Sequence, residues 1–191
     1  MKKDIILSGV GGQGILSIAT IIGEAATEAG INLKQAEVHG MSQRGGDVQS
    51  NLRLSTEPIY SDLLAQGGAD LIIAMEPMEA LRYLTYLDKD GWMITSSNPF
   101  INIPNYPDTE ELLAELSALP QVKLAHIDDI AKENKLPRGA NMVLLGMAAP
   151  YIGIISVEQL RSAIGRVFAR KGEKVVNDNL IAFDLGLNAV K

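Results

Sequence analysis

A run of glycines near the amino terminus has the residue types needed to bind a phosphate. Gly9, Gly11 and Gly14 match the pattern G-x-G-x-x-G, with Gly12 and Gln13 inside it. Glycines permit a tight turn and the close approach of an anion, and free amides at the start of the next helix can bond that anion. We therefore expect all five residues to bind a phosphate-bearing or anionic group. A strand-to-helix turn without a ligand is the alternative.

An acidic residue follows this turn at a spacing that suits a dinucleotide site. Glu37 comes after Gly14 at about the 20-residue distance at which such a carboxylate holds a ribose. A free-standing NAD-dependent oxidoreductase of the Rossmann type therefore stays open, with His39 as its evident proton donor. A ligand-binding module without turnover is a further alternative.

A second polar loop lies between two expected strands, in the run Glu37–Gly46, which reads E-V-H-G-M-S-Q-R-G-G. Arg44 could hold a phosphate or carboxylate through two parallel hydrogen bonds, and His39 could carry a proton near neutral pH. We take Glu37, His39, Gln43 and Arg44 as candidate binding residues. If the first two strands are neighbours, this loop leaves the same sheet edge as the glycine turn. A loop held by its own polar side chains is the alternative.

Composition excludes several classes of function. The chain has 191 residues with 17 Lys and Arg against 23 Asp and Glu, a net charge of −6, which argues against nucleic-acid binding. It has no cysteine, so disulfides, thiolate zinc sites and cysteine-ligated iron–sulfur clusters are excluded, and two separate histidines make a transition-metal site unsupported. Neither a G-x-S-x-G nor a P-loop motif occurs, so we assign no catalytic residue.

Hydrophobic periodicity predicts alternating strands and helices. The expected strands are 5–7, 32–38, 47–55, 70–75, 92–95 and 122–126, and the expected helices are 15–29, 77–87, 109–119, 128–134, 141–152, 156–169 and 177–187. Only about eight residues separate the second and third strands, too few for a parallel crossover, so these two should be antiparallel neighbours unless the third follows an unusual route. The whole chain, 1–191, is expected to form one three-layer α/β/α Rossmann-like domain with a mixed, mostly parallel sheet.

No segment predicts a membrane anchor. The longest apolar region, 142–155, falls short of the ~18 residues that a span requires, and the start of the chain lacks a signal-peptide core. We therefore expect a cytoplasmic protein with no membrane partner.

These motifs resemble those of a known family. The glycine turn and the loop run are similar to blocks of the gamma-type subunits of 2-oxoacid:ferredoxin oxidoreductases, and in particular of the indolepyruvate type. The segments 70–83, 141–146 and 176–183 resemble further blocks in the same order, so the similarity extends over nearly the whole chain. The loop run is the specific signal, whereas the glycine turn alone is common.

The resemblance implies an accessory subunit that is inactive alone. Complexes of this family oxidatively decarboxylate a 2-oxoacid, here an aryl pyruvate such as indolepyruvate, to an acyl-coenzyme A, and electrons pass to ferredoxin. Thiamine diphosphate and iron–sulfur clusters would belong to a large alpha subunit as partner. By the same resemblance, this chain would bind coenzyme A (CoA), with Gly11, Gly12, Gln13 and Gly14 near an anionic part of it and Arg44 close by.

Overall fold

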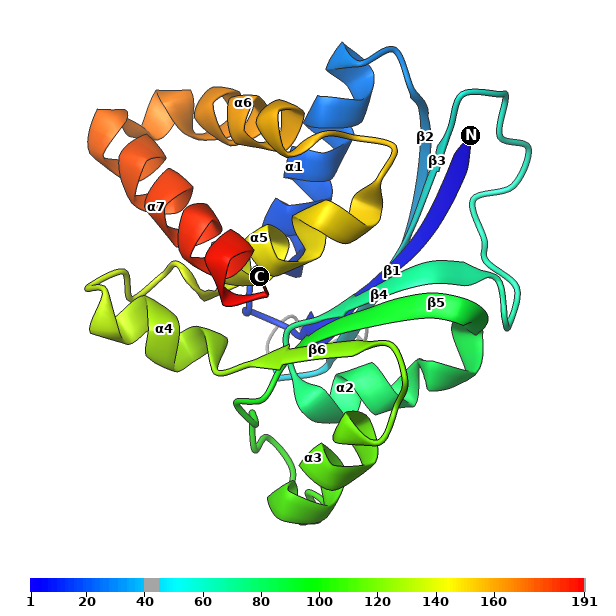
Figure 1. Cartoon of the computed structure of the whole chain (residues 1–191), viewed down its shortest axis with the longest axis vertical. Coiled ribbons are helices and arrows are strands. Elements are labelled where there is room, and N and C mark those ends of the chain that lie inside the picture. The colour runs from blue at the N-terminus through cyan, green and yellow to red at the C-terminus, as the bar shows by residue number, and fades with distance from the viewer. Residues whose placement is uncertain (40–44, 191) are drawn as a thin grey trace.

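The computed structural model describes residues 1–39 and 45–190. Within these ranges six strands form one sheet in the order β2-β3-β1-β4-β5-β6 (Figure 1). Their bounds are β1 Lys2–Val10, β2 Asn32–His39, β3 Asp47–Ser55, β4 Ala69–Ala74, β5 Leu87–Ser96 and β6 Val122–Ala125. Strands β1, β4, β5 and β6 are parallel neighbours, whereas β3 runs antiparallel to both β1 and β2. The expected mixed, mostly parallel sheet is confirmed.

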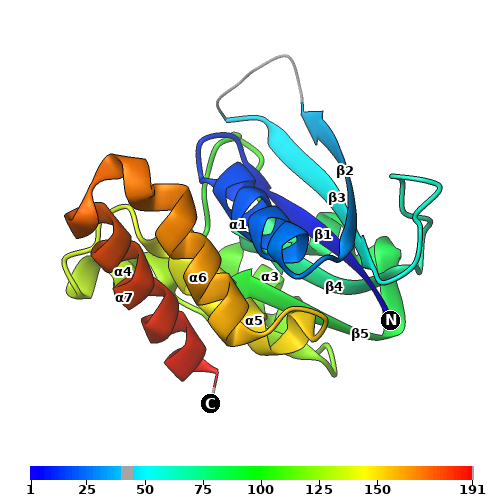
Figure 2. The same cartoon turned by 90° about the horizontal axis from the view of Figure 1, so that it is seen from above.

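Helices cover both faces of this sheet, so the fold has three layers (Figure 1). Their bounds are α1 Ile15–Glu28, α2 Pro77–Arg82, α3 Thr109–Ser117, α4 Ile127–Glu133, α5 Ala140–Ile152, α6 Val157–Phe168 and α7 Glu173–Ala189. Helices α1 and α5 contact the strands on one face, and α2 and α3 contact them on the other. Helices α6 and α7 pack on the outer side of α1 and α5, as the view from above shows (Figure 2).

The central strands are apolar because both of their faces are covered. In β4, the side chains of Leu71 and Ile73 belong to the larger core beneath α1 and α5, and Ile72 belongs to the smaller core beneath α2 and α3. All three are fully buried. This alternation is the reason why the run is apolar throughout and shows no polar face.

Two glycines bring α5 and α7 into backbone contact. A β-carbon at Gly146 of α5 would overlap the carbonyl oxygen of Phe183, and one at Gly186 of α7 would overlap that of Val143. Helix α5 can therefore pack this closely on α7 only because both positions lack a side chain. The contact joins the middle of α5 to the carboxyl-terminal part of α7.

The structure corrects two of the sequence expectations and excludes one condition that the sequence left open. Strands β1 and β2 are not neighbours, because β3 lies between them. The helix expected over 77–87 ends at Arg82, and a separate 3-10 turn covers Leu84–Tyr86 before β5. The last helix begins at Glu173, earlier than 177, so the Asn-Asp-Asn run 177–179 lies inside it and does not cap it. The antiparallel pairing of β2 with β3 is confirmed.

Candidate functional site

The glycine turn is held closed by its own residues and by the end of the second loop. The amide of Val10 donates to Oε1 of Gln13 at 2.7 Å. The amide of Gly11 donates to the carbonyl of Gly46 at 2.8 Å, and that of Gly45 donates back to Gly11 at 3.3 Å. The second loop therefore does return to the glycine turn, although β3 and not β2 is the neighbour of β1.

Each of three glycines in the turn serves a different purpose. A β-carbon at Gly9 would lie 3.0 Å from the β-carbon of Met75, so this glycine permits close packing. Gly14 has a φ of +91°, and a β-carbon there would lie 2.6 Å from Nδ2 of Asn141. Gly12 has a φ of +103° and open space where a side chain would be. The space above Gly12 is therefore free for a ligand.

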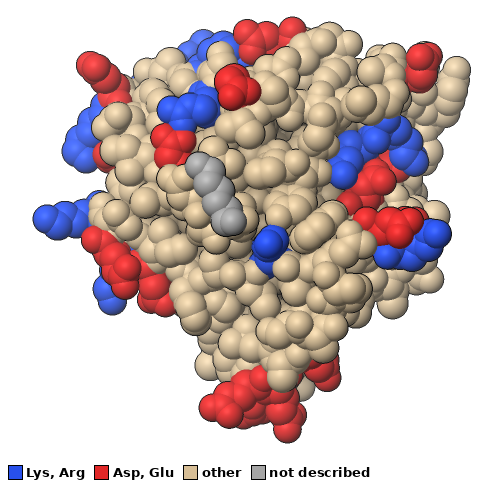
Figure 3. Space-filling view, viewed as in Figure 1, with Lys and Arg blue, Asp and Glu red and all other residues tan. Residues whose placement is uncertain are grey.

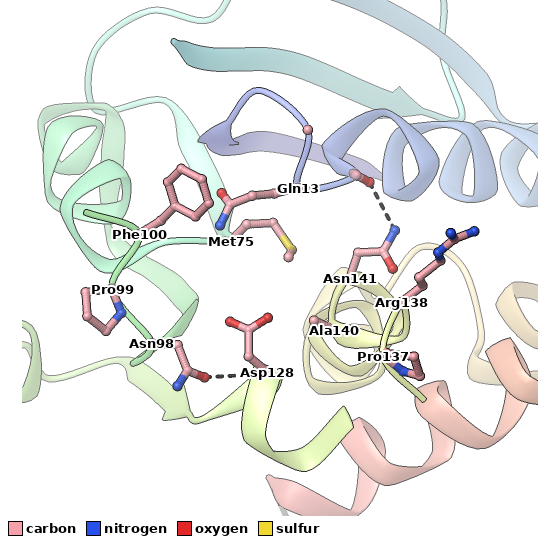
Figure 4. Close-up of a pocket in the computed structure, with 12 residues that line it drawn as sticks. Gln13, Met75, Asn98, Pro99, Phe100, Asp128, Pro137, Arg138, Ala140 and Asn141 are labelled. Atoms are coloured by element: carbon pink, nitrogen blue, oxygen red, sulfur yellow. Dashed lines mark hydrogen bonds between the residues drawn. The ribbon is translucent and has the colours of Figure 1, made fainter. Parts of the chain in front are cut away.

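A cavity of about 450 Å³ opens beside this turn, and we name it the glycine-turn cavity (Figure 4). Its walls are Gly12, Gln13 and Gly14, Met75 after β4, residues 98–100, Asp128 of α4, and the segment that carries Arg138 and Asn141. These segments come from the carboxyl ends of β1, β4 and β5 and from the starts of α4 and α5, which is where α/β sheets form ligand sites. Asn141 donates to the carbonyl of Gly14 at 3.3 Å and so connects α5 to the turn.

A buried carboxylate holds the loop that forms one wall of this cavity. Glu76 is fully buried, and its Oε1 accepts from the amide of Phe100 at 3.3 Å and from the hydroxyl of Tyr106. Burial, followed by the neighbouring Glu76 carboxylate, raises the pKa of Tyr106 above its usual range, so its hydroxyl stays protonated and donates. Farther along, Asn102 donates to the carbonyl of Gly45 at 2.8 Å. The loop is therefore held at Phe100, Asn102 and Tyr106.

The carboxylate of Asp128 is the negative charge of the glycine-turn cavity. Asn98 accepts from the amide of Asp128 at 3.0 Å and donates to Asp129 at 3.0 Å. Desolvation, followed by the negative charge of Asp129, raises the pKa of Asp128 above its usual range. An anion that enters this cavity will therefore meet the least opposition when Asp128 is protonated.

A second cavity of about 650 Å³ adjoins the first, and we name it the basic cavity. It shares Pro137, Arg138 and Asn141 with the glycine-turn cavity. Its basic side chains are Lys135, Arg138, Lys171 and Lys174, and Asp178 is the acidic residue of its lining. Figure 4 shows Arg138 on the side of Asn141 that faces away from Asp128. In a chain with a net charge of −6, this wall is a local excess of positive charge.

Three helices begin at these cavities without a side-chain cap. Helices α1, α5 and α7 start after Gly14, Gly139 and Gly172, and among the described residues no side chain bonds their first amides. Residues Gly14 and Ser17 of the first start, and the starts of the other two, contribute to the cavity walls. Unbonded amides and the positive end of a helix dipole together favour an anion.

The structure places the sequence-predicted binding residues in different positions. Gly12, Gln13 and Gly14 line the glycine-turn cavity, whereas Gly9 and Gly11 shape the turn behind it. Glu37 lies exposed on β2, two strands away from β1, and lines neither cavity. The backbone of His39 ends β2. Gln43 and Arg44 lie outside the described residues.

Sequence reasoning missed the residues that complete the site. Asn98 and Asp128 follow strands that end at the same sheet edge as β1, so their proximity follows from the parallel order once that order is known. Lys135 and Arg138 are far in sequence from Lys171 and Lys174, and no local pattern joins the two pairs. The sequence feature that marks these basic residues is the glycine before each adjacent helix, Gly139 before α5 and Gly172 before α7.

The described residues hold neither a metal centre nor a membrane-spanning helix. No group of three His, Cys, Asp or Glu side chains is placed to hold a metal ion in residues 1–39 and 45–190. Over the same part of the chain, none of the helices has the length and apolar character to span a membrane.

Comparison with known proteins finds one family over nearly the whole chain. The model of the family described as pyruvate ferredoxin/flavodoxin oxidoreductase matches residues 4–189. The chain is 35% identical to the indolepyruvate oxidoreductase subunit IorB of Archaeoglobus fulgidus over 98% of this chain and 95% of that one.

Solved structures share the fold. The gamma subunit of a keto/oxoacid ferredoxin oxidoreductase from Geobacter sulfurreducens is 26% identical, with a TM-score of 0.70 over 98% of both chains. The 2-oxoglutarate:ferredoxin oxidoreductase of Magnetococcus marinus, solved with 2-oxoglutarate, coenzyme A and succinyl-CoA bound, has a TM-score of 0.77 at 24% identity. That match covers 99% of this chain and 31% of the other, so the fold forms part of a longer chain there.

Proposed function

Because the chain belongs to the pyruvate ferredoxin/flavodoxin oxidoreductase family, we propose that it is an accessory subunit of a complex that oxidatively decarboxylates a 2-oxoacid to an acyl-CoA. In this proposal the 2-oxoacid is an aryl pyruvate such as indolepyruvate. The support for that substrate is the 35% identity, over 98% of the chain, to a subunit named for indolepyruvate.

The proposal divides the chemistry between this chain and a larger partner subunit. Thiamine diphosphate and iron–sulfur clusters belong to the partner, which passes electrons to ferredoxin in the cytoplasm. The absence of cysteine from this sequence supports the division, because the chain has no thiolate with which to ligate a cluster. The isolated chain is then inactive, and it acts by binding a substrate of the complex.

We propose that this substrate is coenzyme A, bound across the two adjoining cavities. CoA supplies the thiol that accepts the acyl group. The observation that carries the proposal is the meeting of three uncapped, glycine-started helices with four basic side chains. Such a wall fits the diphosphate and phosphate groups of CoA, because free amides bond phosphate oxygens and cations neutralise them. The glycine turn at Gly12 and Gly14 would hold the diphosphate.

The direct test is CoA binding by calorimetry to the assembled complex, without 2-oxoacid. The variant Gly12→Leu places a side chain in the space above the turn, so we expect about tenfold weaker CoA binding or worse. Gly30→Leu is the matched control, because Gly30 also has positive φ and open surroundings but ends α1 far from the turn. It should bind CoA as the wild type does.

Two results would contradict the proposal. Equal CoA affinity in the two variants would exclude the glycine turn as a binding element. Complexes that bind NAD but not CoA would instead support a dinucleotide-binding enzyme.

A further inference from the structure

The basic cavity differs from the glycine-turn cavity in the charge of its walls. Four of its lining residues are cationic and one, Asp178, is anionic. The glycine-turn cavity shares Arg138 with it but adds the carboxylate of Asp128. Two neighbouring parts of one ligand would therefore meet opposite electrostatic conditions, and the more highly charged anion belongs in the basic cavity.

Two of the four cations are available to a ligand. The ammonium of Lys174 is 2.8 Å from Asp178, and that of Lys171 lies 5.1 Å from the centre of the Phe168 ring. Lys135 and Arg138 are exposed, and neither makes an ion pair or a side-chain hydrogen bond with any described residue. An unpaired arginine can donate two parallel hydrogen bonds to a phosphate. An unpaired lysine at the same wall can add a positive charge beside that phosphate.

The backbone at Lys135 is held in a conformation that normally requires glycine. Lys135 has a φ of 59° and is the one residue other than glycine with positive φ in the described part of the chain. Its amide donates to Lys132 at 3.0 Å, and the amide of Leu136 donates to Ala131 at 2.8 Å. These two bonds form the Schellman motif that ends α4, and Lys135 occupies the position at which glycine is preferred.

A lysine at that position costs stability relative to glycine, so the question is what its side chain contributes. Glycine would satisfy the same two hydrogen bonds without strain. What lysine adds is a charged side chain that lines the basic cavity after the end of α4. The combination of a strained backbone and an unpaired ammonium indicates a ligand contact.

We propose that the basic cavity is a subsite for the terminal phosphate monoester of the ligand, and that it selects CoA over its dephospho form. The proposal rests on the proposed function and names the residues that bind the terminal phosphate of that substrate. A phosphate monoester carries about −1.5 to −2 charges at pH 7, more than either phosphate of a diphosphate diester. Arg138 and Lys135 contact it directly, and Lys171 and Lys174 contribute to the surrounding positive field.

The test compares CoA with dephospho-CoA, two ligands that differ only in this phosphate. Equilibrium binding of each to the assembled complex is measured by calorimetry without 2-oxoacid. The wild type should prefer CoA by about tenfold or more, the ratio expected for charge-assisted hydrogen bonds to one group. Arg138→Gln and Lys135→Gly should weaken CoA binding toward that of dephospho-CoA and weaken dephospho-CoA binding by a much smaller factor, because Arg138 also lines the glycine-turn cavity.

Two controls separate this role from structure and from net charge. Lys89→Gln removes the same charge from an exposed position on β5, where it pairs with Asp90, and should leave both affinities unchanged. Lys135→Gly should raise the melting temperature while it weakens CoA binding, because it relieves the backbone strain. A residue with only a structural role would not move the two measurements in opposite directions.

The outcomes also separate this inference from the proposed function. Equal binding of CoA and dephospho-CoA by the wild type would overturn the subsite and leave CoA binding intact. The subsite is also overturned if Arg138→Gln and Lys135→Gly weaken the binding of both ligands by the same factor. If neither ligand binds to the wild-type complex, the proposed function itself fails, and the subsite fails with it.

Discussion

Three of the four helices that begin at the two cavities differ from those that begin elsewhere, the exception being α4, where Asn98 accepts from the amide of Asp128. Helices α2, α3 and α6 are capped by their own side chains, Glu76, Asp108 and Ser156. Ser156 and Gln159 even form a reciprocal pair of bonds, at 3.1 and 2.8 Å. Helices α1, α5 and α7 start after glycine and have no such cap from any described residue.

This contrast indicates which helix starts have amides that can bind a ligand. A capped start has its first amides satisfied and gains stability. An uncapped start leaves amides for a ligand and forgoes that stability. Acidic side chains gather over the capped helix α3, at the bottom of Figure 3, and Glu110 and Glu111 belong to its first turn.

The largest expected effect concerns the glycine contact between the two uncapped helices α5 and α7. Gly186→Ala should lower the free energy of unfolding by about 3 kcal/mol or more, because its methyl group overlaps backbone of α5 that cannot move aside. Gly165→Ala in α6 is the control, since a β-carbon there meets nothing within 4 Å. It should stabilise by about 0.5–1 kcal/mol. Denaturant unfolding of both variants measures this, and equal effects would refute the backbone contact.

The second-largest expected effect on stability comes from removing the side-chain caps of α3 and α6. Ser156→Ala and Asp108→Ala should each cost about 1 kcal/mol of stability, because each leaves first-turn amides without a partner. The stabilisation that saturating CoA confers should be the same in both variants as in the wild type. A cap variant that alters CoA stabilisation would show that the two groups of helix starts are not separate.

A smaller effect is expected inside the glycine-turn cavity. Asp128→Asn should strengthen CoA binding by about two- to fivefold at pH 7, because it removes a negative charge that faces an anionic ligand. Relative to the variant, the wild type should gain CoA affinity as pH falls through the raised pKa of Asp128, because the phosphate of the ligand titrates equally in both comparisons. Titration calorimetry from pH 7 to 5 measures both, with Asp90→Asn on exposed β5 as the control. Weaker binding by Asp128→Asn would mean that this carboxylate accepts a hydrogen bond from the ligand.

The smallest effect is a pH dependence within a capped helix. Burial raises the pKa of Glu79, although its bonds to Arg82 at 2.8 and 3.2 Å act in the opposite direction. The folded state therefore holds this proton more tightly than the unfolded state, and the stability that it contributes is lost as pH rises from the unfolded to the folded pKa. Unfolding from pH 4 to 7 should show the wild type losing stability relative to Glu79→Gln as pH rises. A constant difference would contradict the shift.

Local patterns predicted the elements and the glycine turn, because each depends on neighbours in sequence. The strand over 32–38 and the one over 47–55 were correctly paired, since a short connection leaves few geometries. The insertion of β3 beside β1 was not predicted, and it removes Glu37 from the glycine turn.

The basic cavity could not be predicted, because it joins the end of α4 to the start of α7 across the packing of α5. That packing depends on Gly146 and Gly186, whose closeness appears only when both helices are placed. The strain at Lys135 was equally hidden, since a lysine after a short helix looks ordinary in sequence.

Amide hydrogen exchange of the assembled complex, with and without CoA, tests the central claim most directly. Unbonded first-turn amides exchange fast, so a bound phosphate should slow them. The amides of Ser17, Met142 and Val175 already donate to the carbonyls of Gly14, Gly139 and Gly172. The account therefore predicts about tenfold or greater slowing at the amides before them, over 15–16, 140–141 and 173–174, and none at the capped starts of α3 and α6. Slowing confined to other segments, or equal at capped and uncapped starts, would contradict it.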